Sequence, residues 1–588
     1  MSDITDIAKV IAVGPDLIEV EVSSTDEYQK MDEQLEIGSY VQISDDNDSC
    51  LIAVVESFRI KDPLSKSDAD VSTPMKFILS LRPVGRLVND KFMRGGKQIT
   101  IPPRRVEIAS AGLLEKIYSA VDPKKRFCFG SLVQNADVKV QLDGDKFFGK
   151  HIGVVGSTGA GKSSTVAAII QEGIRQSQSQ KQSGILNNAH VIIFDLHGEY
   201  SSAFPAARAI GVDTIKLPYW LMNSEELEEM FIESNEQNSH NQVSQFRNAV
   251  IENKKKHASN GEAAVSYDSP IYFSLQEVVN YLTHLNTEVI SKIATDRNLP
   301  KFADDQLLVE NRSDHYFGEP RAFVELSTSA ATKASNGPFN GEFNRFLMRL
   351  DARRNDKRLD FLLDPTNADG AAFTTGDLPL LLEQFMGYGG ETCNVTIIDL
   401  SGIPFEVLSV VVSLITRLIF TFNFHFKKHR TKGEQELPYL LVYEEAHNYI
   451  PQSEGAKYGT VKRAIERIAK EGRKYGISLM IVSQRPSEIS ETVFSQCSNF
   501  VAMRLTNPAD QRYVRRLLPD NLSAITDSLP SLERQEAIII GDSVSLPSLV
   551  KVFDIENLPD SDDINFQTEW KRDWLDVAIP EIIRKWQS

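Results

Sequence analysis

The run Gly156-Ser157-Thr158-Gly159-Ala160-Gly161-Lys162-Ser163 fits the pattern G-x-x-x-x-G-K-S/T without a mismatch. Apolar residues 152–155 precede it and helix formers 164–170 follow, which is the strand–loop–helix context of a phosphate-binding loop. Glycines let consecutive backbone N–H groups turn inward around an anion. We therefore expect ATP to bind here, with Lys162 on its β- and γ-phosphates and the Ser163 hydroxyl on Mg²⁺.

Composition bounds the class of protein. The 588 residues predict two to four domains, and 41% hydrophobic with 25% charged residues is typical of globular proteins. A net charge of −17 argues against wholesale electrostatic binding to nucleic acid, but it leaves a locally basic channel open. The polar N-terminus resembles no signal peptide and the four cysteines form no C-x-x-C pair, so we expect a reduced, cytoplasmic protein.

One apolar stretch, 407–426, is long enough to raise the question of a membrane span. Arg417 lies near its middle, and a central arginine is costly in lipid. We therefore expect a helix buried against a sheet, in a protein that does not enter a membrane.

The first 108 residues are expected to form β-structure. Short apolar runs alternate with turn signals such as Gly14-Pro15-Asp16. Their spacing favours a small N-terminal β-barrel, which we interpret as an assembly module. The runs cover residues 10–13, 17–22, 40–43, 51–55 and 77–81.

From about residue 125 the pattern alternates strands with helices, which is typical of an α/β fold with a parallel sheet. Each expected strand is short and apolar, as strands buried on both faces are. Ligands bind at the carboxyl ends of such strands, so the polar residues that follow them are candidate site residues. The strands are expected at 152–155, 191–194, 395–398, 439–443 and 478–482.

Residues 206–389 differ, because helix signals replace strand signals and favour a helical insertion. Asn223 with Glu226, and Ser274 with Glu277, are typical capping pairs at helix starts. The basic run 254–256 is expected on a solvated helix face and not on DNA.

The tail 551–588 carries three of the four tryptophans of the chain, Trp570, Trp574 and Trp586. Exposed aromatic side chains are typical of contact surfaces. We expect this tail to dock on the chain's own body or on a neighbouring subunit.

Two carboxylates, Glu444 and Glu445, follow the strand expected at 439–443. An ATPase of this kind needs one acid on the Mg²⁺ side and one that orients the attacking water. Position assigns Glu444 to the metal and Glu445 to the water, but the sequence leaves open which carboxylate has which role.

Three more candidates follow from position along the strands. Asp195, at a strand end, is expected in the Mg²⁺ shell, whereas Glu199 could be structural. Gln484 follows another strand, where an amide can sense the γ-phosphate. Residues 462–474 form a basic stretch typical of a charged helix face, but Arg473 within it could reach a neighbouring subunit's γ-phosphate as an arginine finger.

Five motifs occur in order along the chain: GSTGAGKSS from Gly156 to Ser164, FDLHGEYS at 194–201, YEEAHNYIP at 443–451, EGRKYGISL at 471–479 and SQRPS at 483–487. Together they resemble the HerA branch of the HerA/FtsK superfamily, which are ring-shaped ATPases that pump DNA. The resemblance implies a RecA-like P-loop ATPase core at 125–205 and 390–550. The segment 206–389 resembles the family's helical bundle, and residues 1–108 resemble its barrel.

The resemblance also implies a homohexamer with ATP sites between subunits and double-stranded DNA in the central pore. Arg473 matches the family's trans arginine, and Lys150 lies where a second basic trans residue is often found. The family's own nucleotide-site positions are matched by Lys162, Ser163, Asp195, Glu444, Glu445 and Gln484.

Members of this branch usually act with an effector, either a NurA-type nuclease in end resection or, in antiphage systems, a nuclease or sirtuin-type NAD hydrolase. The sequence contains no nuclease or sirtuin motif, so such an activity would come from a partner. The resemblance thus implies a double-stranded DNA translocase or helicase in DNA end processing or antiviral defence. The alternative is an ATP-gated hexameric scaffold that assembles and regulates an effector without translocating DNA.

Overall fold

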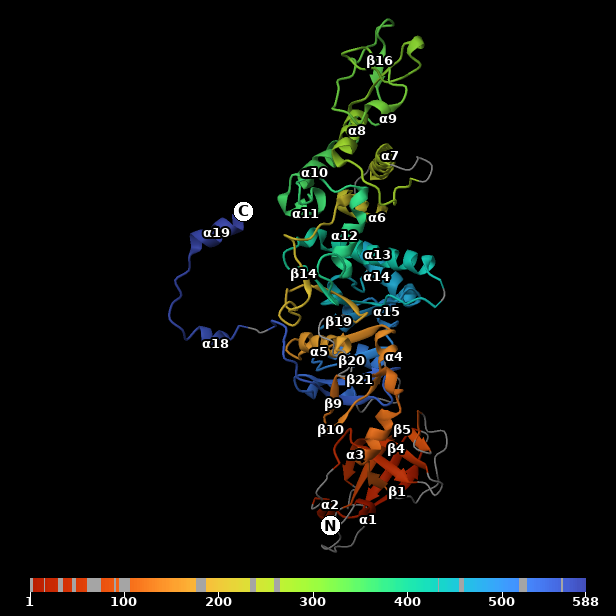
Figure 1. The fold of residues 1–588 in the computed structure, drawn as a ribbon, viewed down its shortest axis with the longest axis vertical. Helices are drawn as coiled ribbons and strands as arrows, with labels where there is room; N and C mark the ends of the chain where they lie inside the picture. Colours follow the sequence, from red (N-terminus) through yellow and green to blue (C-terminus); the bar gives the residue numbers. More distant parts are fainter. Residues whose placement is uncertain are drawn as a thin grey trace, which may run out of the picture.

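The computed structural model describes residues 4–14, 16–29, 35–44, 49–60, 76–88, 91–94, 106–175, 187–232, 239–258, 265–431, 433–453, 459–517, 526–561 and 564–587. An N-terminal sheet, a central α/β body and an elongated insertion follow one another along the longest axis (Figure 1). The C-terminal segment leaves the central body sideways as an arm (Figure 1).

An 11-stranded sheet forms the centre of the molecule, in the order β10-β9-β22-β21-β20-β12-β19-β18-β13-β17-β14. Neighbours from β20 to β14 pair in parallel, and the strands from β21 to β10 pair antiparallel. The strands of the parallel part are β12 (Ile152–Val155), β13 (His190–Asp195), β14 (Arg208–Ile210), β17 (Val395–Asp399), β18 (Tyr439–Tyr443), β19 (Ile477–Ser483) and β20 (Asn499–Ala502). The others are β9 (Gly130–Leu132), β10 (Asn135–Lys139), β21 (Glu536–Gly541) and β22 (Ser548–Val552).

The five strands expected from the sequence are all present, and they are parallel. All residues of β12, β18 and β19 are buried, because helices cover both faces of a parallel sheet. β19 lies between the strand before the glycine loop and the strand before the two glutamates. The carboxyl ends of these strands therefore meet along one edge, which we call the carboxyl edge. The opposite edge is the amino edge.

The helices around this sheet are α3 (Ala111–Ser119), α4 (Gly144–Phe148), α5 (Lys162–Ile174), α13 (Phe405–His429), α14 (Gly459–Glu471), α15 (Glu491–Phe494) and α16 (Pro508–Leu517). By length and composition α13 could cross a membrane, but most of its apolar window is buried within the body. Arg417, near its middle, pairs with buried Glu226 at 2.8 Å. The expected buried helix is therefore confirmed. Two short strands, β8 (Arg126–Phe127) and β11 (Leu142–Asp143), pair in a separate two-stranded ribbon.

A separate antiparallel sheet forms the N-terminal module, in the order β1-β2-β5-β4-β3-β7 with β6 beside β5. It has its own hydrophobic core, and the buried Tyr40 hydroxyl donates to the carbonyl of Pro547 at 2.6 Å, which ties the module to the body. The described part of this sheet runs from β1 to β7 without a pairing between the two, so closure into a barrel stays a prediction. Its elements are α1 (Ile4–Ile7), β1 (Ala8–Val13), β2 (Ile18–Val22), α2 (Thr25–Gln29), β3 (Tyr40–Ser44), β4 (Ser49–Ile60), β5 (Phe77–Val88), β6 (Lys91–Arg94) and β7 (Val106–Ile108).

The insertion consists of helices joined by long irregular segments, and the capping box of Asn223 with Glu226 starts α6. Ser274 caps α8 by accepting the backbone N–H of Glu277. The sequence analysis did not anticipate β14 in the large sheet, nor the distal pair β15 (Val289–Ser291) and β16 (Ala334–Asn336). The helices are α6 (Ser224–Phe231), α7 (Ser239–His257), α8 (Leu275–Thr287), α9 (Arg312–His315), α10 (Asn344–Arg354), α11 (Asp360–Leu363) and α12 (Leu378–Met386).

The expectation for the basic run at 254–256 is wrong for Lys254. Its side chain is buried, and its ammonium group donates to the carbonyls of Tyr267 and Ser269 at 2.6 and 2.7 Å. Burial lowers the pKa of Lys254 from 10.5 to about 7. Charge runs predict a solvated face only on average, and here one turn of α7 points its first lysine inward to satisfy two loop carbonyls.

The C-terminal arm consists of α18 (Phe566–Glu569), α19 (Ile579–Gln587) and the residues around them. Trp574 is 99% exposed and Trp586 is 85% exposed. The hydrogen bonds of residues 564–587 stay within that segment, and Figure 1 shows it standing off the body. The arm therefore presents aromatic side chains to solvent in a single chain.

Candidate nucleotide site

The glycine loop lies at the carboxyl edge, between β12 and α5. Gly159 and Gly161 have φ angles of 74° and 92°, a left-handed conformation that side chains resist. A Cβ on Gly156 would lie 2.9 Å from the Cβ of Met503, so a larger residue would move the loop. No side chain caps the start of α5, which leaves its first N–H groups free for an anion.

Lys162 is 8% exposed and lies behind the loop, with its ammonium nitrogen 3.5 Å from the carbonyl oxygen of Ser157. Burial lowers the pKa of Lys162, while nearby Glu445, Glu444 and Glu199 oppose that shift. The lysine therefore lies between the phosphate loop and a group of carboxylates.

The Ser163 hydroxyl donates to Glu199 Oε2 at 2.8 Å and lies 3.4 Å from Glu444 Oε1. The Tyr200 hydroxyl also lies 3.4 Å from Glu444 Oε1. Two carboxylates from different strand ends thus meet at the hydroxyl that the sequence assigns to Mg²⁺.

Glu444 is almost completely buried, and its Oε2 has no hydrogen-bond partner among the described residues. Burial raises the pKa of Glu444 well above its ordinary value, and repulsion from Asp195, Glu199 and Glu445 adds to the shift. An orphaned buried carboxylate oxygen is costly, which points to an absent cation.

Glu445 has a left-handed backbone, with φ 46° and ψ 47°. Such a conformation costs about 1–3 kcal/mol in a residue other than glycine and is concentrated at functional sites. Its Oε2 lies 3.3 Å from His447 Nδ1, which in turn lies 3.2 Å from the Ser483 hydroxyl. The turn therefore aims Glu445 and Glu444 at different neighbours.

Asp195 is buried, and its carboxylate accepts the backbone N–H groups of Gly198, Glu199 and Tyr200. It shapes the loop that carries Glu199 to Ser163. A direct Mg²⁺ contact of Asp195 stays a prediction, whereas Glu199, which sequence reasoning considered structural, touches the metal-side hydroxyl. Glu199 lies within the FDLHGEYS motif, but the sequence of a loop does not reveal which of its acidic side chains turns inward.

Gln484 directly touches the glycine loop. The Thr158 hydroxyl donates to Gln484 Oε1 at 2.6 Å, and the N–H of Gly156 donates to the Ser483 carbonyl at 3.3 Å. The end of β19 is therefore coupled to the start of the loop, as a γ-phosphate sensor requires.

The residues present suit a magnesium ion. Ser163, Glu199 and Glu444 supply only oxygen donors, the ligand type that Mg²⁺ prefers, and Glu444 Oε2 is free. Mg²⁺ bound with ATP would neutralise charge on the β- and γ-phosphates.

Arg473 and Lys150 lie at the amino edge and not with the other site residues. Arg473 is exposed just before β19, and Lys150 precedes β12 and pairs with Asp542. β19 has 7 residues, about 20 Å of strand, and it separates Arg473 from the glycine loop of its own chain. Neither residue is therefore placed to touch a nucleotide bound in the same chain.

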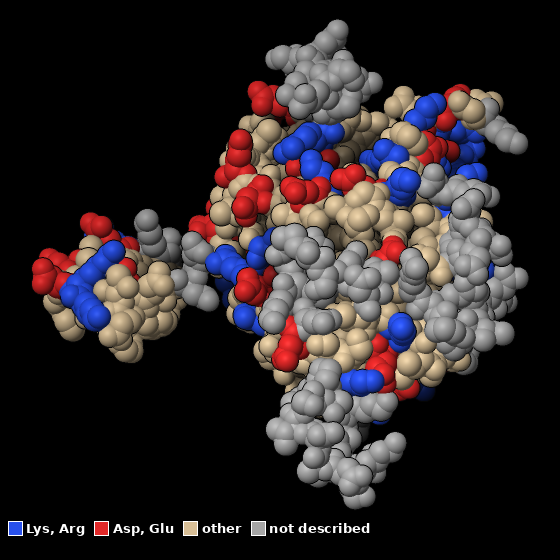
Figure 2. Space-filling model, turned by 90° about the horizontal axis from the view of Figure 1, so that it is seen from below, with Lys and Arg blue, Asp and Glu red and all other residues tan. Residues whose placement is uncertain are grey.

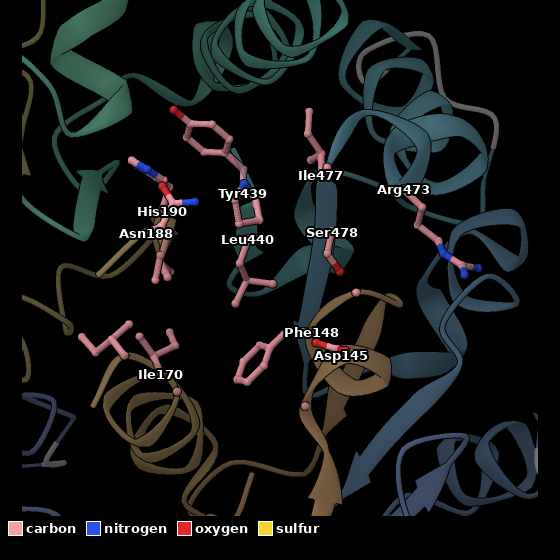
Figure 3. Close-up of a pocket in the computed structure, with 18 residues that line it drawn as sticks. Asp145, Phe148, Ile170, Asn188, His190, Tyr439, Leu440, Arg473, Ile477 and Ser478 are labelled. Atoms are coloured by element: carbon pink, nitrogen blue, oxygen red, sulfur yellow. The ribbon is translucent and has the colours of Figure 1, made fainter. Parts of the chain in front are cut away.

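The amino edge also has a pocket of about 450 Å³. Phe148, Ile170 and Leu440 face its hollow, and Arg473 lies at its rim with the guanidinium turned away (Figure 3). The lining is mostly apolar, so this pocket is unlike the glycine loop.

Comparisons with known proteins agree with this geometry. The family model "Helicase HerA, central domain" matches residues 127–327. The "DNA double-strand break repair helicase HerA" of Sulfolobus acidocaldarius is 26% identical over 495 residues, 82% of this chain and 79% of that protein. Its namesake from Saccharolobus solfataricus is 27% identical over 80% of this chain and 77% of that protein. The chain is thus similar to HerA-type helicases over most of its length.

A solved structure of VirB4 from Thermoanaerobacter pseudethanolicus superposes with a TM-score of 0.41 at 13% identity, covering 74% of this chain and 98% of that one.

The groups at the carboxyl edge could divide the work of ATP hydrolysis among them. The loop N–H groups and Lys162 would bind and orient the phosphates, and burial behind β12 would exclude water from that side. A carboxylate held by a strained turn, as Glu445 is, can accept a proton from an attacking water. Thr158 and Gln484 link the phosphate end of the site to β19.

Proposed function

We propose that this HerA-type ATPase is a homohexameric, cytoplasmic, Mg²⁺-dependent translocase or helicase on double-stranded DNA that works with an effector enzyme. The observation that carries the proposal is the division of the site between the two edges of one sheet. Lys162, Glu444 and Glu445 lie at the carboxyl edge, whereas Arg473 lies at the amino edge. A site of this kind is completed only by a second copy.

The carboxyl edge of one copy and the amino edge of another copy can meet only in a head-to-tail contact. Such heterologous contacts close into a ring when the rotation between copies allows it. Arg473 would then stabilise charge on the neighbour's γ-phosphate, and Lys150 would do so after exchanging its Asp542 partner. This arrangement makes hydrolysis dependent on assembly.

The arm supplies a second surface for assembly. Asp560 donates its backbone N–H to the carbonyl of Glu199, and Ser202 donates to the carbonyl of Leu558, so the arm begins beside the nucleotide groups. Exposed Trp570 and Trp574 would be covered by docking on the neighbour that completes the site. We assign 125–205 and 390–550 to a RecA-like core, 206–389 to the insertion, 1–108 to a closed barrel and 551–588 to the docking tail.

The surface charge restricts where DNA would bind. Acidic and basic side chains are interleaved over the described part of the N-terminal end (Figure 2). Lys427 donates to the Lys474 carbonyl, and Arg430 pairs with Glu434 and Glu436. These engagements favour DNA in a channel of the ring over DNA on the outer faces. The names of the archaeal relatives support DNA ends as the substrate.

The effector would be a nuclease or a sirtuin-type NAD hydrolase, acting in DNA end processing or antiphage defence. The match to the HerA central domain supports the ATP-driven translocase in this proposal, and the effector would be a separate protein. The N-terminal module is the natural effector platform, because it lies at the end of the chain away from the insertion (Figure 1).

Steady-state ATP hydrolysis with and without linear duplex DNA tests the proposal. Wild type should be stimulated by DNA, and both Lys162→Ala and Glu445→Gln should abolish the activity, whereas Lys255→Ala on the distant insertion should not. Hydrolysis that ignores DNA would favour the alternative, an ATP-gated hexameric scaffold that regulates an effector without translocation. A Glu445→Gln ring that still supports full effector activity would favour the same alternative.

A further inference from the structure

A second arginine, Arg504, lies against the glycine loop from within the same chain. It follows β20, the strand on the other side of β12 from β19, so it belongs to the carboxyl edge. Its guanidinium Nη2 lies 4.0 Å from the position that a Cβ on Gly159 would occupy. This arginine is therefore distinct in place from Arg473.

The backbone around Arg504 is fastened to the loop. The N–H of Ser157 donates to the Arg504 carbonyl at 2.7 Å, and the N–H of Thr506 donates to the Ser157 hydroxyl at 3.1 Å. Before it, the N–H of Met503 donates to the Val155 carbonyl at 2.8 Å. The segment 503–506 thus runs along the first half of the loop and holds the arginine in a fixed position.

The side chain of Arg504 lacks the partners that an arginine normally has. Its Nε is buried and makes no hydrogen bond, and no carboxylate among the described residues pairs with it. A buried unsatisfied donor is costly to a protein, so it calls for an explanation. A planar, permanently charged fork beside a phosphate-binding loop suits a phosphate oxygen better than any other group of a nucleotide.

We propose that Arg504 binds the phosphate chain of the nucleotide held by its own subunit. The inference rests on the nucleotide site proposed above and adds a cis arginine to it. Arg504 thereby differs from Arg473, which the fold reserves for a neighbouring copy. It strengthens triphosphate binding in a single chain before the ring completes the site.

Binding of ATP and of inorganic tripolyphosphate to Arg504→Met tests this inference by calorimetry. Both should bind about tenfold more weakly than to wild type, the loss expected for one charge-assisted hydrogen bond. Arg504→Lys, which keeps the charge but not the fork, should lose less. The matched control is Arg516→Ala, because Arg516 is exposed near Glu491, which precedes β20 at the other edge.

The unliganded melting temperature separates a binding role from a structural one. Arg504→Met removes an unsatisfied buried donor, so the apo protein should melt no lower than wild type, while its ATP-induced stabilisation should shrink. A lower apo melting temperature with unchanged tripolyphosphate affinity would overturn the inference. Weaker binding of ATP alone would also overturn it, since that result places Arg504 on the adenosine.

Failure of this inference is distinguishable from failure of the nucleotide site itself. If wild type binds tripolyphosphate and Lys162→Ala does not, the site stands, and Arg504→Met then decides the role of the arginine alone. If wild type binds neither ATP nor tripolyphosphate, both proposals fall.

Discussion

At the carboxyl edge of the central sheet, several polar groups of one chain face one another, whereas Arg473 at the amino edge is exposed to solvent. The Ser163 hydroxyl lies within hydrogen-bonding reach of both Glu199 and Glu444 at the carboxyl edge. At the amino edge Arg473 is exposed, beside a pocket with an apolar lining (Figure 3). The carboxyl edge therefore has the features of a ligand-binding site, and the amino edge has the features of a subunit interface.

The difference follows from the parallel sheet. All parallel strands begin at one edge and end at the other, so residues before strands are kept about one strand length from residues after them. Arg473 precedes β19 and Gln484 follows it. Arg473 and Gln484 are close in sequence, but the length of β19 separates them in space.

Loss of the amino-edge arginine should produce the largest effect. Arg473→Ala should lower kcat by about 10³-fold or more, because an arginine finger supplies that much transition-state stabilisation. The Kd for ATP should stay near that of wild type, because the binding groups lie at the other edge. Stopped-flow hydrolysis and equilibrium ATP binding measure the two quantities, and Arg467→Ala, an exposed arginine of α14 that pairs with Glu471, is the control. A large loss of ATP affinity in Arg473→Ala would contradict the separation of the binding groups from this arginine.

A smaller effect is expected from the carboxylate that the sequence analysis undervalued. Glu199→Gln should raise the Mg²⁺ concentration for half-maximal hydrolysis about tenfold, the usual cost of disturbing a group that orients a metal ligand. Glu172→Gln on the same helix as Ser163, where Glu172 pairs with Arg175, should leave that concentration unchanged. Magnesium titrations of hydrolysis measure it. If both variants need the same Mg²⁺ concentration for half-maximal hydrolysis, Glu199 does not contribute to metal binding.

The amino edge should also be the more acid-sensitive part. His151 Nδ1 accepts the N–H of Leu479 at 3.0 Å, so Nε2 carries the proton that it donates to the Ala469 carbonyl at 2.9 Å. Burial lowers the pKa of His151 from 6.5 to about 4. The hydrogen bond to the Ala469 carbonyl opposes this shift, and the nearby positive charge of Arg473 adds to it. Between these two values the unfolded chain binds a proton that the native chain does not.

Stability from His151 should therefore be present above pH 6.5 and be lost as the pH falls toward 4. The loss approaches about 1.4 kcal/mol per pH unit relative to His151→Gln, which cannot titrate in this range. Urea unfolding at pH 7, 6 and 5 measures the free energy of unfolding of both proteins. Parallel pH profiles of wild type and variant would contradict the assignment.

The smallest effect on stability should come from the arm. Removing residues 562–588 should leave the Tm of the body within about 1 °C, because the described arm side chains are exposed and bury little surface. The same truncation should reduce hexamer formation in light scattering, and Trp574→Ser in the full chain should do so in part. A truncated chain that assembles like wild type would separate the arm from the carboxyl-edge contact.

Much of the carboxyl edge was predictable from sequence, because strand ends can be recognised one strand at a time. The glycine loop, Glu444, Glu445 and Gln484 each follow an apolar run, and all lie where that pattern indicates. Glu199 and Arg504 were missed for the same physical reason. Glu199 depends on a loop that Asp195 folds by accepting three N–H groups, and Arg504 follows a strand without a motif.

Long-range packing explains the remaining differences between sequence and structure. Lys254 is buried because carbonyls 13 and 15 residues away receive its protons, which a charge run does not reveal. β14 joins the central sheet from within the insertion because β17 offers it an edge. The tail predicted to dock is exposed in one chain, since docking on a neighbour needs a second copy.

Mixed rings test the central claim most directly. Lys162→Ala and Arg473→Ala subunits, co-expressed with different tags and purified as mixed rings, should recover ATP hydrolysis that neither variant has alone. Each Arg473→Ala subunit keeps an intact carboxyl edge that a Lys162→Ala neighbour can complete with its own arginine. Rings of Lys162→Ala with Glu445→Gln, both defective at the carboxyl edge, should recover none, and rings of Lys162→Ala with wild type set the attainable rate. No recovery in the first mixture, while the wild-type mixture is active, would contradict the account.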